Sequence, residues 1–277
     1  MGQHTITAGT HNEFFSFKNS FLPNYDGTWQ FNSMAAFEAG TASRYLLTYA
    51  IDPSTGLPDS TRQPVAKFNV SQLGFYVQDA YAVLPNLNVT LGVRMDIPLI
   101  SDKPTNNARF DSIYEPVYGV RTDKIGQGHA LFSPRLGINW DVFNNKKTQV
   151  RGGIGLFTGR PGYVWISNQF SNTGADLGTI DISAGIPNFN QLTPIVGGYS
   201  NHDAVHQPVA GAAGKSTINV MDKNFKYPQI ARFDMAVDHE IGWGTIGTFE
   251  VTASKNIHEV LFQDISLAAA TTTIFDG

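Results

Sequence analysis

Alternation of apolar and polar residues over long segments constrains this chain more than any other feature. In LNVTLGVRMDIP (87–98), every second residue from Val89 to Ile97 is apolar, and the residues between them are polar or glycine. A period of two predicts a β-strand with one apolar and one polar face. In a soluble sandwich the apolar face would form the core, whereas in a membrane barrel it would face lipid and the polar face would line the lumen.

The same alternation recurs and predicts seven long strands. They span residues 3–17, 67–84, 88–98, 131–143, 147–158, 228–241 and 244–257. Strands of about ten residues or more are long enough to cross a bilayer when tilted. No apolar run approaches the about 20 residues that a membrane helix needs, so we expect any membrane crossing to be made by strands.

Short and long connections alternate between these strands. Turn-forming residues make short links at 85–88, 144–147 and 242–244, whereas residues 98–131 and 159–227 form very long links. Short turns on one side and long loops on the other are the plan of an outer-membrane barrel. We therefore expect the short turns on the periplasmic side and the long links outside the cell.

Residues 20–64 also read as a long loop. One helical turn is predicted at Met34 to Ala39, behind Ser33 as a possible N-cap.

Composition supports an envelope protein and excludes several classes of site. Only 15% of the residues are charged, against an average of about 25%. A net charge of −4 argues against a nucleic-acid partner, and the absence of cysteine excludes disulfides, thiol nucleophiles and zinc–thiolate sites. The first residues lack a basic segment followed by an apolar one, so we expect no signal peptide in this chain.

The polar faces favour a lumen over a solvent-exposed surface. They carry arginines beside aspartates and glycines, a combination suited to bidentate ion pairs in a confined space. These arginines are Arg94, Arg135, Arg151 and Arg232. Trp140 and Trp243 lie close to short turns, where interfacial aromatic residues are expected.

Three motif-like segments predict no chemistry. VAGAAGKST (209–217) lacks the first glycine of a phosphate-binding loop, and RGGIGLFTGRPGY (151–163) fails the GxGxxG pattern at Thr158. His202 and His206 have the spacing of a helical zinc pair, but glycines before them and Pro208 after them argue against a helix. We expect no metal, no cofactor and no enzymatic activity.

Longer segments resemble the barrel of TonB-dependent outer-membrane receptors. They are LGFYVQDAYAVLPNLNVTLGVRMDIP, FSPRLGINWDVFNNKKTQVRGGIGLFTGRPGYVWISNQFSNTG and NFKYPQIARFDMAVDHEIGWGTIGTFEVTASKNIHEVLFQDISL, with HTITAGTHNEFFSFKNSF and FNSMAAFEAG as an upstream hairpin and loop. The subgroup that this chain is most similar to has a carboxypeptidase-regulatory-like domain before its plug. The resemblance implies an all-β, antiparallel transmembrane barrel in the cell outer membrane, of which about seven strands of 22 lie in this chain.

The resemblance also implies a domain organisation and partners. Residues 1–277 are expected to be part of a receptor barrel, with the plug domain, the signal peptide and the C-terminal closing strand absent from the chain. The implied partners are outer-membrane lipid, the protein's own plug domain, an energy-transducing inner-membrane complex and an unknown extracellular ligand.

Two function classes remain. The first is a receptor component for binding and energy-coupled uptake of an unidentified substrate, with ligand contacts predicted at Arg160, Tyr163, Trp165 and Asn168. For these residues the competing interpretation is an aromatic anchor that holds the loop. The second class is a secreted β-sandwich binding module, for example for glycans, that uses aromatic loop residues such as Tyr163 and Trp165.

Overall fold

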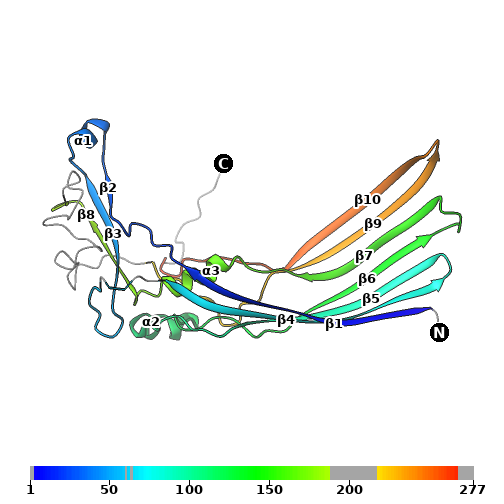
Figure 1. Ribbon diagram of the computed structural model, residues 1–277, viewed down its shortest axis with the longest axis horizontal. Helices are drawn as coiled ribbons and strands as arrows, with labels where there is room; N and C mark the ends of the chain where they lie inside the picture. Colours follow the sequence, from blue (N-terminus) through cyan, green and yellow to red (C-terminus); the bar gives the residue numbers. More distant parts are fainter. Residues whose placement is uncertain (1–2, 60, 63–64, 188–216, 268–277) are drawn as a thin grey trace.

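Seven long strands form one antiparallel sheet, as the alternation predicts. The computed structural model describes residues 3–59, 61–62, 65–187 and 217–267. Within these residues the strand order of the large sheet is β1-β4-β5-β6-β7-β9-β10 (Figure 1). The strands are β1 (His4–Asn19), β4 (Ala66–Leu84), β5 (Leu87–Ile100), β6 (Leu131–Asp141), β7 (Thr148–Thr158), β9 (Gln229–Gly242) and β10 (Thr245–His258). Each strand end lies within two residues of its predicted place.

The register aligns apolar residues with apolar residues across the sheet. Leu91 on β5 lies opposite Leu136 on β6, which lies opposite Ile154 on β7, which lies opposite Phe233 on β9. Because side chains alternate between the two faces of a strand, this row belongs to one apolar face, which Asp79 of β4, opposite Leu91, interrupts.

The apolar face is the exposed one. Leu91 and Ile154 are 56% and 55% exposed, whereas Asp96 and Ser133 on the polar face are 3% and 1% exposed. A soluble sandwich would bury the apolar rows between two sheets. Away from the short turns, the apolar face is therefore exposed while the polar face is covered, which is the opposite of a sandwich and is what a barrel wall in lipid requires.

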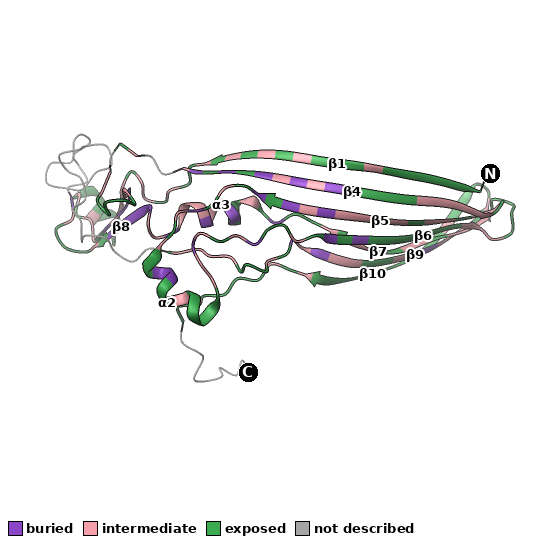
Figure 2. Cartoon of the chain, turned by 90° about the horizontal axis from the view of Figure 1, so that it is seen from below, coloured by how far each residue is buried: buried purple, intermediate pink, exposed green. Residues whose placement is uncertain are grey.

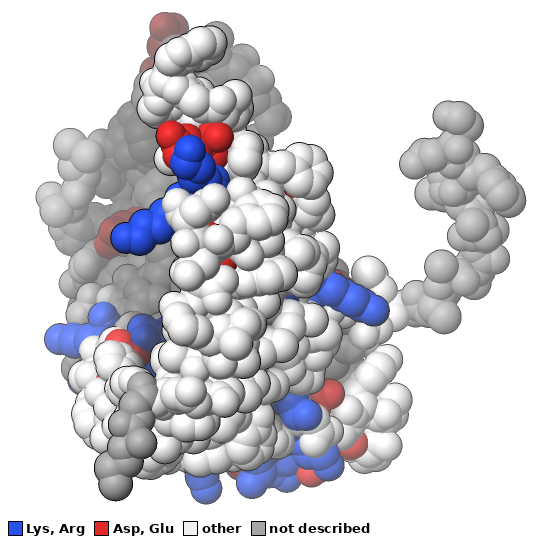
Figure 3. Space-filling model, turned by 90° about the vertical axis from the view of Figure 1, so that its right-hand side faces the viewer, with Lys and Arg blue, Asp and Glu red and all other residues white. Residues whose placement is uncertain are grey.

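Exposure also changes along the strands. The buried stretches lie in the halves of β4, β5 and β6 that are away from the short turns, near α3, and we call this end of the sheet its outer end. The halves nearer the short turns are mostly exposed or half-buried (Figure 2). Viewed from the turn end, broad uncharged areas separate small clusters of charged side chains (Figure 3).

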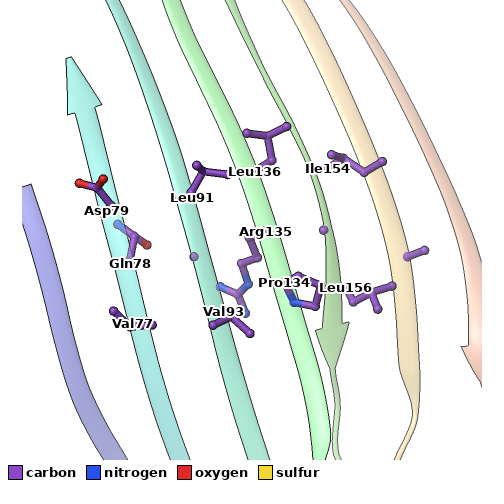
Figure 4. A pocket seen from close by; sticks show the side chains of 13 residues that line it. Val77, Gln78, Asp79, Leu91, Val93, Pro134, Arg135, Leu136, Ile154 and Leu156 are labelled. Atoms are coloured by element: carbon purple, nitrogen blue, oxygen red, sulfur yellow. The ribbon is translucent and has the colours of Figure 1, made fainter. Parts of the chain in front are cut away.

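A hollow of about 650 Å³ lies on the apolar face (Figure 4). Its lining includes the polar residues Gln78, Asp79 and Arg135. Most of the lining is apolar: Val77, Leu91, Val93, Pro134, Leu136, Ile154 and Leu156. A mainly apolar lining suits hydrocarbon chains.

The three short turns lie at one end of the sheet (Figure 1). Two residues, Pro85 and Asn86, separate β4 from β5. In the β6–β7 turn the Asp141 carboxylate accepts a hydrogen bond of 2.8 Å from the Lys146 amide. In the β9–β10 turn Trp243 adopts a positive φ of 54° and is fully exposed, as expected for an aromatic side chain that reaches a membrane interface.

The reading of residues 20–64 as one long loop is wrong in part. The segment contains β2 (Thr28–Gln30), α1 (Met34–Glu38) and β3 (Arg44–Ala50), and β3 pairs with β8 (Leu177–Ile182) in a separate sheet of order β2-β3-β8. The predicted helical turn is confirmed as α1, where the Ser33 hydroxyl accepts a hydrogen bond of 3.1 Å from the Ala36 amide.

The core of this small sheet explains why local alternation misses it. Tyr45, Leu47, Tyr49 and Ile180 are buried together. β3 is buried at almost every position and so shows no period of two, and its partner β8 lies in another long link.

The other long links contain helices that were not predicted. They are α2 (Ala108–Tyr118) and α3 (Tyr163–Ser171). No helix in the described ranges has the length and apolarity needed to cross a membrane.

A charge on the apolar face should destabilise the sheet far more than a charge on the polar face. Leu136 has apolar cross-strand neighbours on both sides, Leu91 and Ile154. It lies five residues from the turn, about 12 Å along a tilted strand and so near the middle of an apolar band about 25 Å tall. We expect Leu136→Arg in the full-length protein to cost about 2–4 kcal/mol. The control Thr90→Arg places the same charge on the polar face and should cost much less. Heat-modifiable migration after urea titration measures both variants, and equal destabilisation would contradict the assignment of the faces.

Single cysteines can test the predicted topology, since the chain has no cysteine of its own. In whole cells a membrane-impermeant maleimide should label Thr105→Cys and Val164→Cys on the long links. Asn86→Cys and Asn145→Cys in the short turns should be protected until the outer membrane is opened. The opposite pattern would invert the orientation. The topology would also place His202, in the link 159–227, outside the cell, but this residue lies outside the described ranges.

Candidate functional site

Ion pairs line the polar face of the sheet. The Arg94 guanidinium donates to the Asp96 carboxylate, with Nη2 and Oδ1 2.7 Å apart, and Asp96 is buried. Arg151 pairs with Asp238 on the neighbouring strand β9, with Nε and Oδ2 2.9 Å apart. These pairs confirm the predicted Arg–Asp network for two of the four strand arginines.

Gly74 shows why glycines accompany these arginines. Gly74 lies opposite Asp96 on β5 and His11 on β1. A Cβ atom at Gly74 would lie 2.8 Å from the His11 carbonyl oxygen and against the Arg94 guanidinium. The missing side chain therefore provides the space in which Arg94 reaches its carboxylate.

Arg135 and Arg232 depart from the prediction. Neither makes an ion pair with any residue in the described part of the chain. The Arg135 guanidinium instead lies over the ring of Phe157, 4.6 Å from its centroid. A cation over an aromatic face is stabilised without losing its net charge.

Helix α3 folds over the outer end of the polar face. Its residues Ile166 and Phe170 pack against Phe68 and Val70 of β4, and the rings of Phe170 and Phe68 are stacked 4.8 Å apart. Tyr163 packs on Phe17 with ring centroids 4.7 Å apart. The spacing 163, 166, 170 puts these residues on one side of a helix, which explains why this segment docks as a helix.

Arg160 fixes the start of this link to β1. Its guanidinium pairs with the Glu13 carboxylate and lies over the ring of Phe15, 5.3 Å from the centroid. Arg160 and Tyr163 are therefore brought together around Phe15, which is also in ring contact with Tyr163. Sequence reasoning missed Glu13, because it lies 147 residues before Arg160 and no local signal links the two.

The predicted ligand patch is divided by the helix. Trp165 lies two residues after Tyr163, about 200° around the helix axis, and so points away from the sheet. Its ring contacts Phe262 edge-on, with centroids 5.3 Å apart. Asn168 is half-buried. Arg160 and Tyr163 thus hold the link on the wall, as the anchor interpretation expects, whereas Trp165 faces outward.

Two tyrosine hydroxyls are buried beneath the link. Tyr227 is 2% exposed, and neither its hydroxyl nor that of Tyr163 has a hydrogen bond of normal geometry to a described residue. Burial raises the pKa of both phenols, and each lies in the electrostatic field of Arg160. Both tyrosines remain neutral at physiological pH and act here as packing groups with polar tips.

The two long links pack against each other at the outer end. The Gln169 side-chain amide on α3 donates to the Lys124 carbonyl at 2.6 Å. From the other link, the Asn107 amide donates to the Thr173 carbonyl at 2.9 Å. The described parts of the links 98–131 and 159–227 therefore form one packed unit, which we call the outer cap. In the described ranges, no three His, Asp or Glu side chains come together as metal ligands.

Removing the stack beneath α3 should release the helix, whereas removing its outward ring should not. We expect Phe170→Ala to cost about 2–4 kcal/mol of local stability, because the ring leaves a cavity against Phe68. Hydrogen exchange of the α3 amides should then rise by orders of magnitude. In the control, Trp165→Ala, exchange should change little. Equal loss of protection in both variants would contradict the docking described here.

Comparison with known proteins places the whole chain in one family. A family model described as "Outer membrane beta barrel domain" matches residues 1–275. Among solved structures, the outer membrane transporter YddB from Escherichia coli is similar, with 13% identity and a TM-score of 0.37. The match covers 86% of this chain and 24% of that chain, so this chain spans about a quarter of the transporter's length. Comparison with curated proteins finds no match. The chain belongs to the family of outer membrane beta-barrel domains.

Proposed function

We propose that this chain forms part of the wall of a TonB-dependent receptor, which binds an extracellular substrate and takes it up with energy coupling. The observation that carries the proposal is the polar face, which bears paired charges along the strands and is covered at its outer end by α3. A surface of this kind suits a hydrated lumen that a solute enters past folded outer loops. The resemblance of the long strand segments to TonB-dependent receptors supports the energy-coupled form of transport.

Each part of the wall has a role in this proposal. The apolar rows hold the sheet in lipid, and ion pairs such as Arg94–Asp96 keep buried charges neutralised along the path. The outer cap supplies the surface that first meets the substrate. The plug domain and an energy-transducing inner-membrane complex are the partners that the full-length protein needs. None of these roles requires a catalytic group.

Trp165 is the member of the predicted patch best placed to meet a ligand. It is 38% exposed on the outward side of α3, and an indole ring provides stacking area together with one donor. Under this proposal Trp165→Ala weakens substrate binding without loosening α3. Arg160 and Tyr163 act indirectly, by holding the helix on the wall.

Comparison of wild-type cells with cells that lack the gene tests the uptake mechanism. Both strains are grown in a defined mixture of small solutes, and depletion of each solute from the medium is followed by mass spectrometry. We expect at least one solute to disappear only with the gene present, and its uptake to stop when an uncoupler collapses the proton gradient. Gene-dependent entry that continues at the same rate after uncoupling would show a passive pore and overturn the energy-coupled proposal.

A further inference from the structure

Arg135 and Arg232 lie in one row across the polar face. Arg135 on β6 is directly opposite Gly155 on β7, and Gly155 is directly opposite Arg232 on β9. With neighbouring strands about 4.8 Å apart, the two arginine Cα atoms are about 10 Å apart on the same face. Two guanidinium groups thus flank a position that has no side chain.

The side chain of Arg135 leans over this glycine. A Cβ atom at Gly155 would lie 3.1 Å from Cγ of Arg135 and 3.3 Å from the ring of Phe157. The guanidinium stacks on that same ring, which orients it while leaving its N–H groups without a carboxylate partner. Arg232, on the far side of Gly155, can reach the same space.

The charge of this pair is not neutralised nearby. The other arginines of the sheet, Arg94 and Arg151, each pair with aspartate, and Arg160 pairs with Glu13. The acidic group nearest in register is Asp234, one row closer to the turns, and it makes no ion pair with a described residue. Even with Asp234 counted, the local group keeps one excess positive charge. Both arginines are exposed, so an anion can reach their N–H groups from the polar side of the sheet.

We propose that Arg135 and Arg232 form a two-arginine site on the lumen wall that binds an oxyanion, a carboxylate or a phosphate. Guanidinium groups present donors in a planar fork that matches both of these anions. The absent side chain at Gly155 lets the anion lie between the two forks. The anion has two possible sources: a small solute in the lumen, or a carboxylate of the same full-length protein from outside this chain. The site needs the polar face to line the lumen but does not need energy coupling, so it can fail independently of the proposed uptake.

Thermal melting of the full-length protein in detergent tests the site. The probe is inorganic phosphate, exchanged against chloride at constant ionic strength. The test variant is Arg135→Gln/Arg232→Gln. The matched control is Arg109→Gln, because Arg109 is exposed on α2, away from the sheet, and makes no ion pair in the described part of the chain. A milder variant, Arg135→Lys/Arg232→Lys, keeps the charge but loses the planar fork, and it serves if the glutamine variant does not fold.

Two outcomes support the site and identify the source of the anion. If the anion is a small solute, phosphate raises Tm of the wild type and of Arg109→Gln saturably, by at least about 2 °C, and the glutamine variant does not respond. If the anion is a carboxylate of the same protein, phosphate has no effect, and the glutamine variant melts below the wild type. The single variant Arg232→Gln must then also lower Tm. Unlike Arg135, Arg232 makes no described ring contact, so a lower Tm in this variant cannot come from the loss of such a contact.

Two other outcomes overturn the site. The first is a glutamine variant that melts at or above the Tm of the wild type and whose Tm responds to phosphate as the Tm of the wild type does. The second is a phosphate response of equal size in the glutamine variant and the wild type, which would place any anion binding elsewhere. The lysine variant should fall between the wild type and the glutamine variant. If the anion is a small solute, this holds for its response to phosphate. If the anion is a carboxylate of the same protein, it holds for its stability.

Discussion

The shared register of six neighbouring strand pairs is the constraint on which the rest of the structure depends. Each pair is antiparallel, and from β5 to β10 the register aligns apolar residues with apolar residues along the apolar face. On β4 the charged residue Asp79 lies in this face, opposite Leu91. A slip of one residue at any interface would move all the side chains of one strand to the other face. In lipid such a slip would expose arginine and aspartate to hydrocarbon and would bury leucine in the lumen. The exposure of the apolar face along the sheet is the direct result of this register.

The same register assembles the polar face from residues far apart in the sequence. It brings Gly74 beneath Arg94, and it puts Gly155 between two arginines. Glycine in a strand weakens the strand, so its repeated use on one face needs a compensating gain. Here the gain is space for long cationic side chains to lie along the wall and reach their partners.

Sequence alone predicted most of the wall and little of the cap. The seven strands and the helical turn after Ser33 follow from local periodicity and capping, which each segment carries by itself. β3 and β8 are different, because β3 is buried on both faces and shows no alternation. Likewise, the residues next to Arg160 in the sequence do not identify its partner, because Glu13 comes close to Arg160 only when the sheet has formed. The predicted ligand patch was divided because an unpredicted helix turned Trp165 away from Tyr163.

The pairing of β3 with β8 joins two long links that leave the wall at different strands. Hydrogen bonds from Gln169 to Lys124 and from Asn107 to Thr173 connect a third link, residues 98–131, to the link that contains α3 and β8. Surface loops usually vary independently of one another, since each is held at its own two ends. In this protein the loops cannot vary independently, because β3 and β8 from two different links share one hydrophobic core. A single loop moved into another protein would carry only one side of that core. New binding specificity at this end of the molecule must therefore arise by coordinated change in several loops, or by small changes at outward positions that leave the shared core intact.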